Sequence, residues 1–128
     1  MDKPWKRWVL YLAAAWNVIG GGMALLDPTK HFAQMYTTSL NLADPLAAFF
    51  YRSVWINVIA WGVAYALAAM WPAARRTVLV AGGGGKLFYA IACAALLGSG
   101  VGKPMILVAA IVDTLFAAAF AAVVLRDR

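Results

Sequence analysis

Three charged residues, Arg52, Lys86 and Asp113, lie inside long apolar runs of this sequence. A charge at the centre of a membrane-spanning helix costs roughly 2.5 to 3.5 kcal/mol on insertion scales, so each one needs a partner or a function. Lys86 also follows four consecutive glycines in the stretch VLVAGGGGKLFYA. An ion pair with Asp113 would neutralise Lys86. Such a pair could be a contact that fixes helix register, or a functional site for a proton, an anion or a lipophilic molecule.

The composition indicates a protein whose surface faces lipid. Of the 128 residues, 65% are hydrophobic and 12% are charged, whereas an average soluble domain carries about 25% charged residues. Glutamate is absent, and the basic residues behind the net charge of +6 cluster at the ends of apolar runs. That placement is typical of membrane orientation, so we expect a lipid bilayer as partner and no nucleic acid.

Four apolar segments, at residues 8–26, 45–71, 77–99 and 104–125, predict transmembrane helices. Each is close to the about 20 residues that cross about 30 Å of hydrocarbon in a helix. Because two of the connections are very short, neighbouring helices should be antiparallel. The expected fold class is all-α. Residues 1–128 should form a single integral membrane domain, an antiparallel four-helix bundle.

Lysine and arginine predict which side of the membrane each connection occupies. Residues 3–7, the expected turn at 72–76 and residues 126–128 carry seven basic residues, against two, Lys30 and Lys103, on the other side. This asymmetry predicts that both termini are cytoplasmic. The longer connection at 27–44 holds the stretch HFAQMY, whose Phe32, Met35 and Tyr36 could lie at the membrane interface.

Depth along the helices brings several polar residues to one level. Counted from opposite faces, Lys86 and Asp113 both lie about 14 Å deep, Asn17 lies at about 14 Å and Asn57 at about 12 Å. The simplest arrangement is an interior pair of Lys86 with Asp113, whose hydrogen bonds Asn17 and Asn57 complete. Tyr89, one turn from Lys86, either joins this network or is a core aromatic residue.

Arg52 is shallower, about 10 Å from the outer face, so its side chain can extend to the surface. We interpret it as an anchor for lipid headgroups, with a ligand site that opens outward as the alternative. His31 and Cys93 are single residues of their kind, so they provide no pair for a metal, haem or disulfide. No motif names a catalytic residue or a cofactor.

Small residues concentrate in two of the expected helices. Glycines without side chains let a second helix approach closely, or let their own helix unwind and offer carbonyls to a ligand. We expect close packing and keep a broken helix as the alternative. The glycines concerned are Gly20, Gly21, Gly82, Gly83 and Gly85.

Four stretches, AWNVIGGGMALLDPTKHFAQMY, FYRSVWINVIAWGVAYALAAMWP, RRTVLVAGGGGKLFYA and VDTLFAAAFAAVV, follow one another in this order. In this order they resemble a group of small bacterial four-helix membrane proteins, and more loosely the DoxX-like superfamily. The resemblance implies a four-helix bundle in a bacterial inner membrane, with Asn17, Arg52, Lys86 and Asp113 on motif positions. It implies no established activity.

Two functions from different classes remain open at this point. The first is a non-enzymatic helper or structural subunit that packs through its small-residue faces against copies of itself or against a larger membrane complex. The second is a small carrier or binding protein for a lipophilic or anionic ligand, with its site at Lys86 and Asp113. A membrane enzyme with Asp113 as base is a third hypothesis, for which the sequence holds no motif.

Overall fold

The computed structural model describes residues 2–127, and this part of the chain forms five α-helices. They are α1 (Pro4–Leu26), α2 (Pro28–Met35), α3 (Pro45–Met70), α4 (Pro72–Gly98) and α5 (Pro104–Arg126). Each helix begins with one of the five prolines of the chain. Proline suits this position because it lacks the N–H that would be unpaired there and its φ angle is already helical.

Four of these helices, α1, α3, α4 and α5, are long and apolar enough to cross a membrane. The all-α class and the four candidate spans are therefore confirmed. Two helix starts differ from the expected ones, because α1 begins at Pro4 and α4 at Pro72. Arg75 and Arg76 consequently lie in the first turns of α4 and not in a connecting turn. Apolar segments mark where a helix crosses lipid, but the helix itself extends into charged residues for as long as its backbone hydrogen bonds continue.

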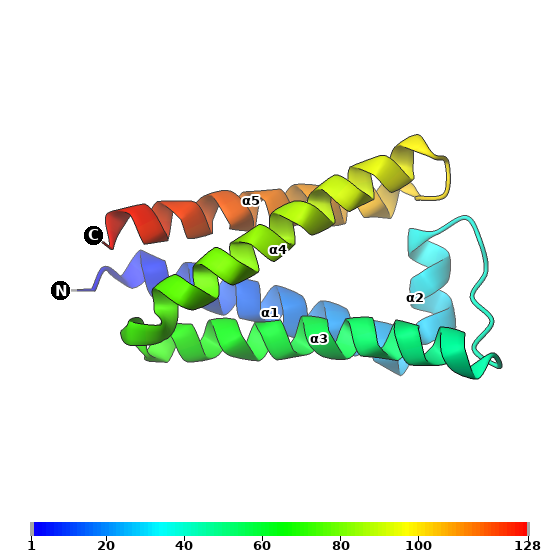
Figure 1. Ribbon diagram of the computed structural model, residues 1–128, viewed down its shortest axis with the longest axis horizontal. Helices are drawn as coiled ribbons and strands as arrows, with labels where there is room; N and C mark the ends of the chain where they lie inside the picture. The colour runs from blue at the N-terminus through cyan, green and yellow to red at the C-terminus, as the bar shows by residue number, and fades with distance from the viewer. Residues whose placement is uncertain (1, 128) are drawn as a thin grey trace.

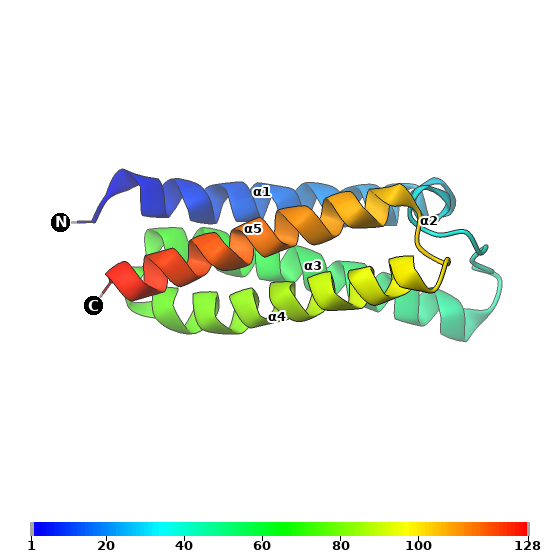
Figure 2. The same ribbon diagram turned by 90° about the horizontal axis from the view of Figure 1, so that it is seen from above.

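The four long helices lie side by side, and the two termini are at the same end of the molecule (Figures 1 and 2). Helix α1 packs along α3, and α4 packs along α5. Near the termini, all four helices contribute to one core, which contains Leu10, Tyr65, Leu79 and Phe120. A second core at the opposite end joins α2 to α4 and α5.

Helix α2 lies at the end of the molecule opposite the termini (Figure 1). The segment that leaves it is bonded to the turn between α4 and α5, since the Thr37 amide donates to the Val101 carbonyl at 2.8 Å and the Lys103 amide to the Met35 carbonyl at 2.9 Å. Met35 is 5% exposed and belongs to the second core. The expectation of an apolar face resting at the interface is therefore wrong for Met35, because the α4–α5 hairpin covers it.

Helix α4 continues through all four glycines of its run, so the alternative of a broken helix is wrong. A Cβ on Gly82 would lie 2.5 Å from the Tyr65 hydroxyl, and one on Gly83 would be in ordinary contact with Phe120 at 3.5 Å. A Cβ on Gly85 would meet nothing within 4 Å. The glycine run therefore lets α3 approach α4 closely on one side only.

Helices α1 and α3 approach each other through two other glycines. A Cβ on Gly21 would lie 2.6 Å from Ile59, and a Cβ on Gly62 would lie 2.8 Å from Val18. Gly20, in contrast, has open space where a Cβ would be. Packing inside this chain thus explains Gly21 and Gly82, and it does not explain Gly20 and Gly85.

Candidate functional site

A buried polar cluster joins three of the long helices halfway along the molecule. The ammonium of Lys86, on α4, lies 2.9 Å from Oδ1 of Asp113 on α5 and 2.9 Å from Oδ1 of Asn17 on α1. The three residues are only 6%, 7% and 7% exposed, respectively. The ion pair therefore sits within the protein and connects the α4–α5 pair of helices to α1.

Most polar atoms of this cluster are hydrogen-bonded within the chain, whereas no hydrogen bond within residues 2–127 reaches Oδ2 of Asp113. Asn17 donates its amide to the Val58 carbonyl at 3.0 Å, which leaves Oδ1 as the atom that faces Lys86. The Lys86 nitrogen also lies 5.6 Å from the ring centre of Tyr65 and 5.3 Å from that of Phe116. Aromatic faces attract a cation at such distances. The ammonium is thus surrounded by two oxygens and two rings.

Trp16 is a member of this cluster that the sequence analysis missed. Its indole nitrogen donates to Oδ1 of Asp113 at 3.2 Å, while the side chain as a whole remains 39% exposed. Trp16 directly precedes Asn17 in the stretch AWN. An aromatic residue with an N–H donor, next to an amide expected inside the membrane, was the signal that could have indicated its membership of the cluster. The partly exposed ring of Trp16 is thus in direct contact with the buried carboxylate of Asp113.

Asn57 does not join the cluster, contrary to the expected arrangement. It is exposed, and its amide donates to the Ser53 carbonyl of the preceding turn at 2.9 Å. Tyr51 and Tyr65 lie on the buried side of α3, whereas Asn57 faces away from it. Depth along the helix alone does not define which side of the helix a residue occupies.

Arg52 and Tyr89 also lie apart from the Lys86–Asp113 pair. Tyr89 is partly buried and packs against the second core, which includes Cys93 and Ala90. Arg52 is exposed and forms no ion pair within residues 2–127. These placements support a core role for Tyr89 and a surface role for Arg52.

A second ionic cluster closes the end of the molecule that carries the termini. The guanidinium of Arg75, 2% exposed, donates to both carboxylate oxygens of Asp2 at 2.8 and 2.9 Å. It also lies 3.8 Å from Asp127, which pairs with Lys6. The hydrogen bonds from Arg75 hold the pKa of the Asp2 carboxyl below its ordinary value. The sequence indicates only an orienting role for the charges of Arg75 and Lys6, whereas the structure pairs both with acidic residues.

The opposite end contains a cluster of aromatic residues around His31. Its ring lies edge-on to Trp55 with 4.7 Å between ring centres, and the Tyr51 hydroxyl lies 3.5 Å from its Nδ1. Tyr51 also donates to the Ala24 carbonyl at 3.1 Å. Burial lowers the pKa of the His31 imidazole, because desolvation disfavours the charged form.

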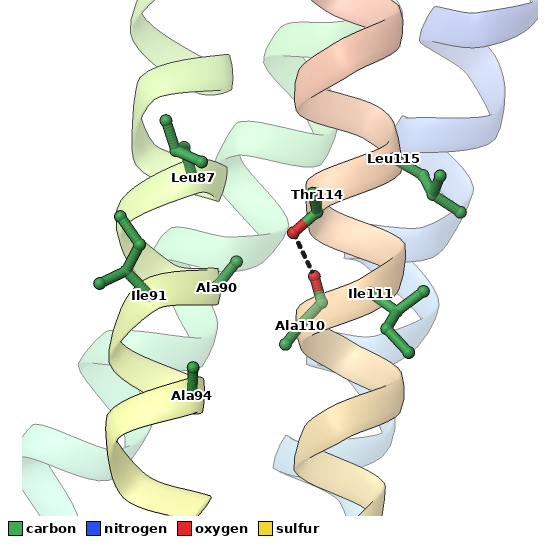
Figure 3. Close-up of a pocket in the computed structure, with 8 residues that line it drawn as sticks. All are labelled: Leu87, Ala90, Ile91, Ala94, Ala110, Ile111, Thr114 and Leu115. Atoms are coloured by element: carbon green, nitrogen blue, oxygen red, sulfur yellow. Dashed lines mark hydrogen bonds between the residues drawn. The ribbon is translucent and has the colours of Figure 1, made fainter. Parts of the chain in front are cut away.

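A shallow groove runs between α4 and α5 (Figure 3). Its volume is about 340 Å³, and the only polar side chain that lines it is Thr114, whose hydroxyl donates to the Ala110 carbonyl at 2.7 Å. The rest of the lining is alanine, leucine and isoleucine, and includes Leu87, one residue after Lys86. The groove therefore offers apolar contacts, and neither Lys86 nor Asp113 lines it.

Within residues 2–127, no group of three histidine, cysteine, aspartate or glutamate side chains could hold a metal ion. Comparison of the chain with protein-family models, curated proteins and solved structures finds no match. The likeness to DoxX-like proteins stays a prediction.

Proposed function

We propose that this protein is a small multi-pass membrane protein that acts, without catalysis, as a helper or structural subunit. It associates through exposed helix surfaces with further copies of itself or with the transmembrane helices of a larger complex. The single observation that carries this proposal is the exposed amide of Asn57 on α3. Its oxygen accepts no hydrogen bond within residues 2–127.

An amide that faces lipid lacks the water that would otherwise pair it. Asn57 is 12 residues beyond the first residue of α3, which corresponds to about 18 Å along a helix about 39 Å long. That position is near the centre of the span. A neighbouring helix can supply the missing hydrogen bond, and asparagine side chains stabilise helix association in this way.

The outer side of α4 provides a second surface suited to association. Ala81 and Gly85 are exposed and spaced four residues apart, so they occupy the same side of the helix. Because neither has a large side chain, another helix can approach the backbone of α4 closely there. Gly20 on α1, which has open space around it, belongs to the same class of surface.

The buried cluster supports a structural role and not a binding role for its charges. Lys86 is bonded to two oxygens inside the chain, and the pair is almost inaccessible. A buried polar contact of this kind can fix the register of packed helices. Its role in the proposed function is to hold α1, α4 and α5 together so that the outer surfaces keep their shape.

The proposal also includes the placement of the chain in a bacterial inner membrane, as an antiparallel bundle with both termini in the cytoplasm. The support is the excess of lysine and arginine near the two termini. The position of both termini at one end of the molecule agrees with this (Figure 1). The resemblance of the motif stretches to small bacterial four-helix membrane proteins supports the bacterial origin.

Site-directed cross-linking in native membranes tests the association. Cys93 is the only cysteine, so Cys93→Ala provides a background for Val54→Cys, which is 55% exposed about one turn before Asn57, and, as control, for Val63→Cys, which is 48% exposed on another side of the same helix. We expect a cross-linked product with Val54→Cys, which keeps the Asn57 amide, at twice the chain mass or at the mass of a larger complex. No product from Val54→Cys, or equal products from both positions, would overturn the proposal.

Self-association can then be measured directly in lipid. An interhelical hydrogen bond in a membrane contributes about 0.6 to 2 kcal/mol. Asn57→Leu should therefore weaken association by about three- to thirtyfold. Val63→Leu should leave it unchanged, and energy transfer between labelled copies measures both.

One observation favours the alternative of a small carrier or binding protein. Trp16, which is 39% exposed, reaches the buried carboxylate of Asp113 and could yield to an amphiphile that enters from the lipid. The fluorescence of Trp16 is obtained as the difference between a protein with Trp16 and the same protein with Trp16→Phe. If dodecyl phosphate or a lipophilic quinone changes the Trp16 fluorescence of the wild type but not that of Lys86→Met, binding at the pair becomes the better account.

A further inference from the structure

A hollow of about 510 Å³ lies along the first turns of α3, and we name it the α3 hollow. It combines one basic residue, one hydroxyl and an apolar wall. The lining residues are Leu42, Ala43, Pro45, Ala48, Phe49, Arg52, Ser53 and Ile56.

The rim of the α3 hollow is held by hydrogen bonds of the segment before α3. Asn41 accepts from the Ala43 amide through its side chain at 3.1 Å and from the Asp44 amide through its carbonyl at 3.2 Å. Asp44 in turn accepts from the Leu46 amide at 3.2 Å and caps the helix. The segment that borders the hollow is thus a defined turn.

Arg52 has no acceptor for its guanidinium within residues 2–127. It is exposed, no ion pair includes it, and none of the side-chain hydrogen bonds involves it. The nearest acid in sequence, Asp44, is used by the helix cap. A guanidinium beside an apolar wall has five N–H donors that need an anion or water, and phosphate oxygens satisfy them in a fork-shaped geometry.

The depth of Arg52 determines which anions can reach it. Helix α3 is about 39 Å long against about 30 Å of hydrocarbon, so the Arg52 Cα lies about 6 Å inside the boundary. From there an arginine side chain extends to the headgroup level. An anion at that level that also contacts Phe49 and Ile56 must carry an apolar tail.

We propose that the α3 hollow binds one anionic phospholipid from the leaflet at the α2 end of the molecule. The phosphate accepts from the Arg52 guanidinium and from the Ser53 hydroxyl, and one acyl chain lies against Phe49 and Ile56. This binding takes place at the headgroup end of α3, whereas the subunit role proposed above rests on Asn57, more than one helical turn deeper. The α3 hollow also differs from the apolar groove between α4 and α5, which has no charged residue.

The test is native mass spectrometry of the delipidated full-length protein in detergent, titrated with phosphatidylglycerol, phosphatidylcholine or inorganic phosphate. We expect a one-to-one phosphatidylglycerol adduct of the wild type, and weaker binding of phosphatidylcholine. Arg52→Gln should weaken the adduct about tenfold, which corresponds to about 1.4 kcal/mol. Arg76→Gln, an exposed arginine at the other end of the molecule, is the matched control and should bind as wild type does.

Ser53→Ala is a second variant, expected to weaken the adduct by a smaller factor without a change in charge. Circular dichroism establishes that each variant is folded. The proposal is overturned if Arg52→Gln binds phosphatidylglycerol as wild type does, or if Arg76→Gln loses as much affinity. It is also overturned if inorganic phosphate displaces the lipid at equal concentration, because the site would then recognise a soluble anion.

Discussion

The buried pair of Lys86 and Asp113 allows a prediction that tests the packing of the whole molecule. The perturbation consists of Lys86→Met, Asp113→Asn and the double variant. Each single change leaves one charge in a position that is 6% or 7% exposed, with its ionic partner 2.9 Å away removed. We expect each single change to lower the free energy of unfolding by about 3 to 5 kcal/mol.

The double variant should recover most of this loss because no buried charge remains. The amide oxygen introduced by Asp113→Asn can still accept a hydrogen bond from the Trp16 indole, which in the wild type donates to Asp113 at 3.2 Å. The Asn17 oxygen loses its bond from Lys86, a loss of about 1 kcal/mol. The double variant should therefore be about 2 to 4 kcal/mol more stable than either single variant.

The assay is equilibrium unfolding in mixed micelles, followed by circular dichroism, with the oligomeric state measured in parallel. Lys30→Met is the control, since Lys30 is exposed on α2, and its effect should stay within about 0.5 kcal/mol. The reasoning is refuted if the two single effects add in the double variant. If instead all variants unfold alike, the charges serve something other than folding, and ligand screening at the pair becomes the next step.

Three further predictions concern the ends of the molecule and its helix contacts. Arg75→Leu should destabilise by about 1.5 to 3 kcal/mol because it removes the two hydrogen bonds from the buried guanidinium to Asp2, whereas Arg76→Leu should change stability by about 0.5 kcal/mol or less. Equal losses in thermal unfolding would contradict this. Gly21→Ala should lower the free energy of unfolding by about 1 to 3 kcal/mol because the added Cβ meets α3, while Gly85→Ala should be neutral or stabilise by up to about 1 kcal/mol. A melting temperature of Gly21→Ala at or above that of Gly85→Ala would contradict this. Because the pKa of His31 is lowered in the folded state, the neutral imidazole contributes fully to the stability of the fold above about pH 6.5. This contribution to stability is lost as the pH falls through the lowered pKa. Wild type should thus lose more stability between pH 7 and 5 than His31→Gln, and parallel losses would refute this.

The all-α fold and the four candidate membrane spans follow from the sequence alone. Apolar runs of about 20 residues have one stable backbone arrangement in lipid, the helix, because every N–H and C=O must be paired within the segment. The helix starts are equally local, since each coincides with a proline. The apolar run predicts a start of α4 at residue 77, five residues late, because hydrophobicity does not mark where a helix backbone begins.

The candidate site was only partly accessible from the sequence. Depth along each helix placed Lys86, Asp113 and Asn17 at one level, and the structure joins them. Depth also placed Asn57 there, but that residue faces outward because the rotation of α3 is set by packing. Trp16 was missed, since an indole beside a carboxylate depends on how α1 lies against α5.

The sequence by itself determined which runs form the four long apolar helices and how far along its helix each polar residue lies. These properties depend on neighbours within a few residues and on the solvent. Only the tertiary structure decided which sides of the helices meet. It placed Arg75 between Asp2 and Asp127, which are separated by nearly the whole chain, and gave Gly21, Gly62 and Gly82 their close contacts while leaving Gly85 open. The physical reason is that helix rotation and spacing depend on side chains from different segments fitting together, and no local pattern encodes that fit.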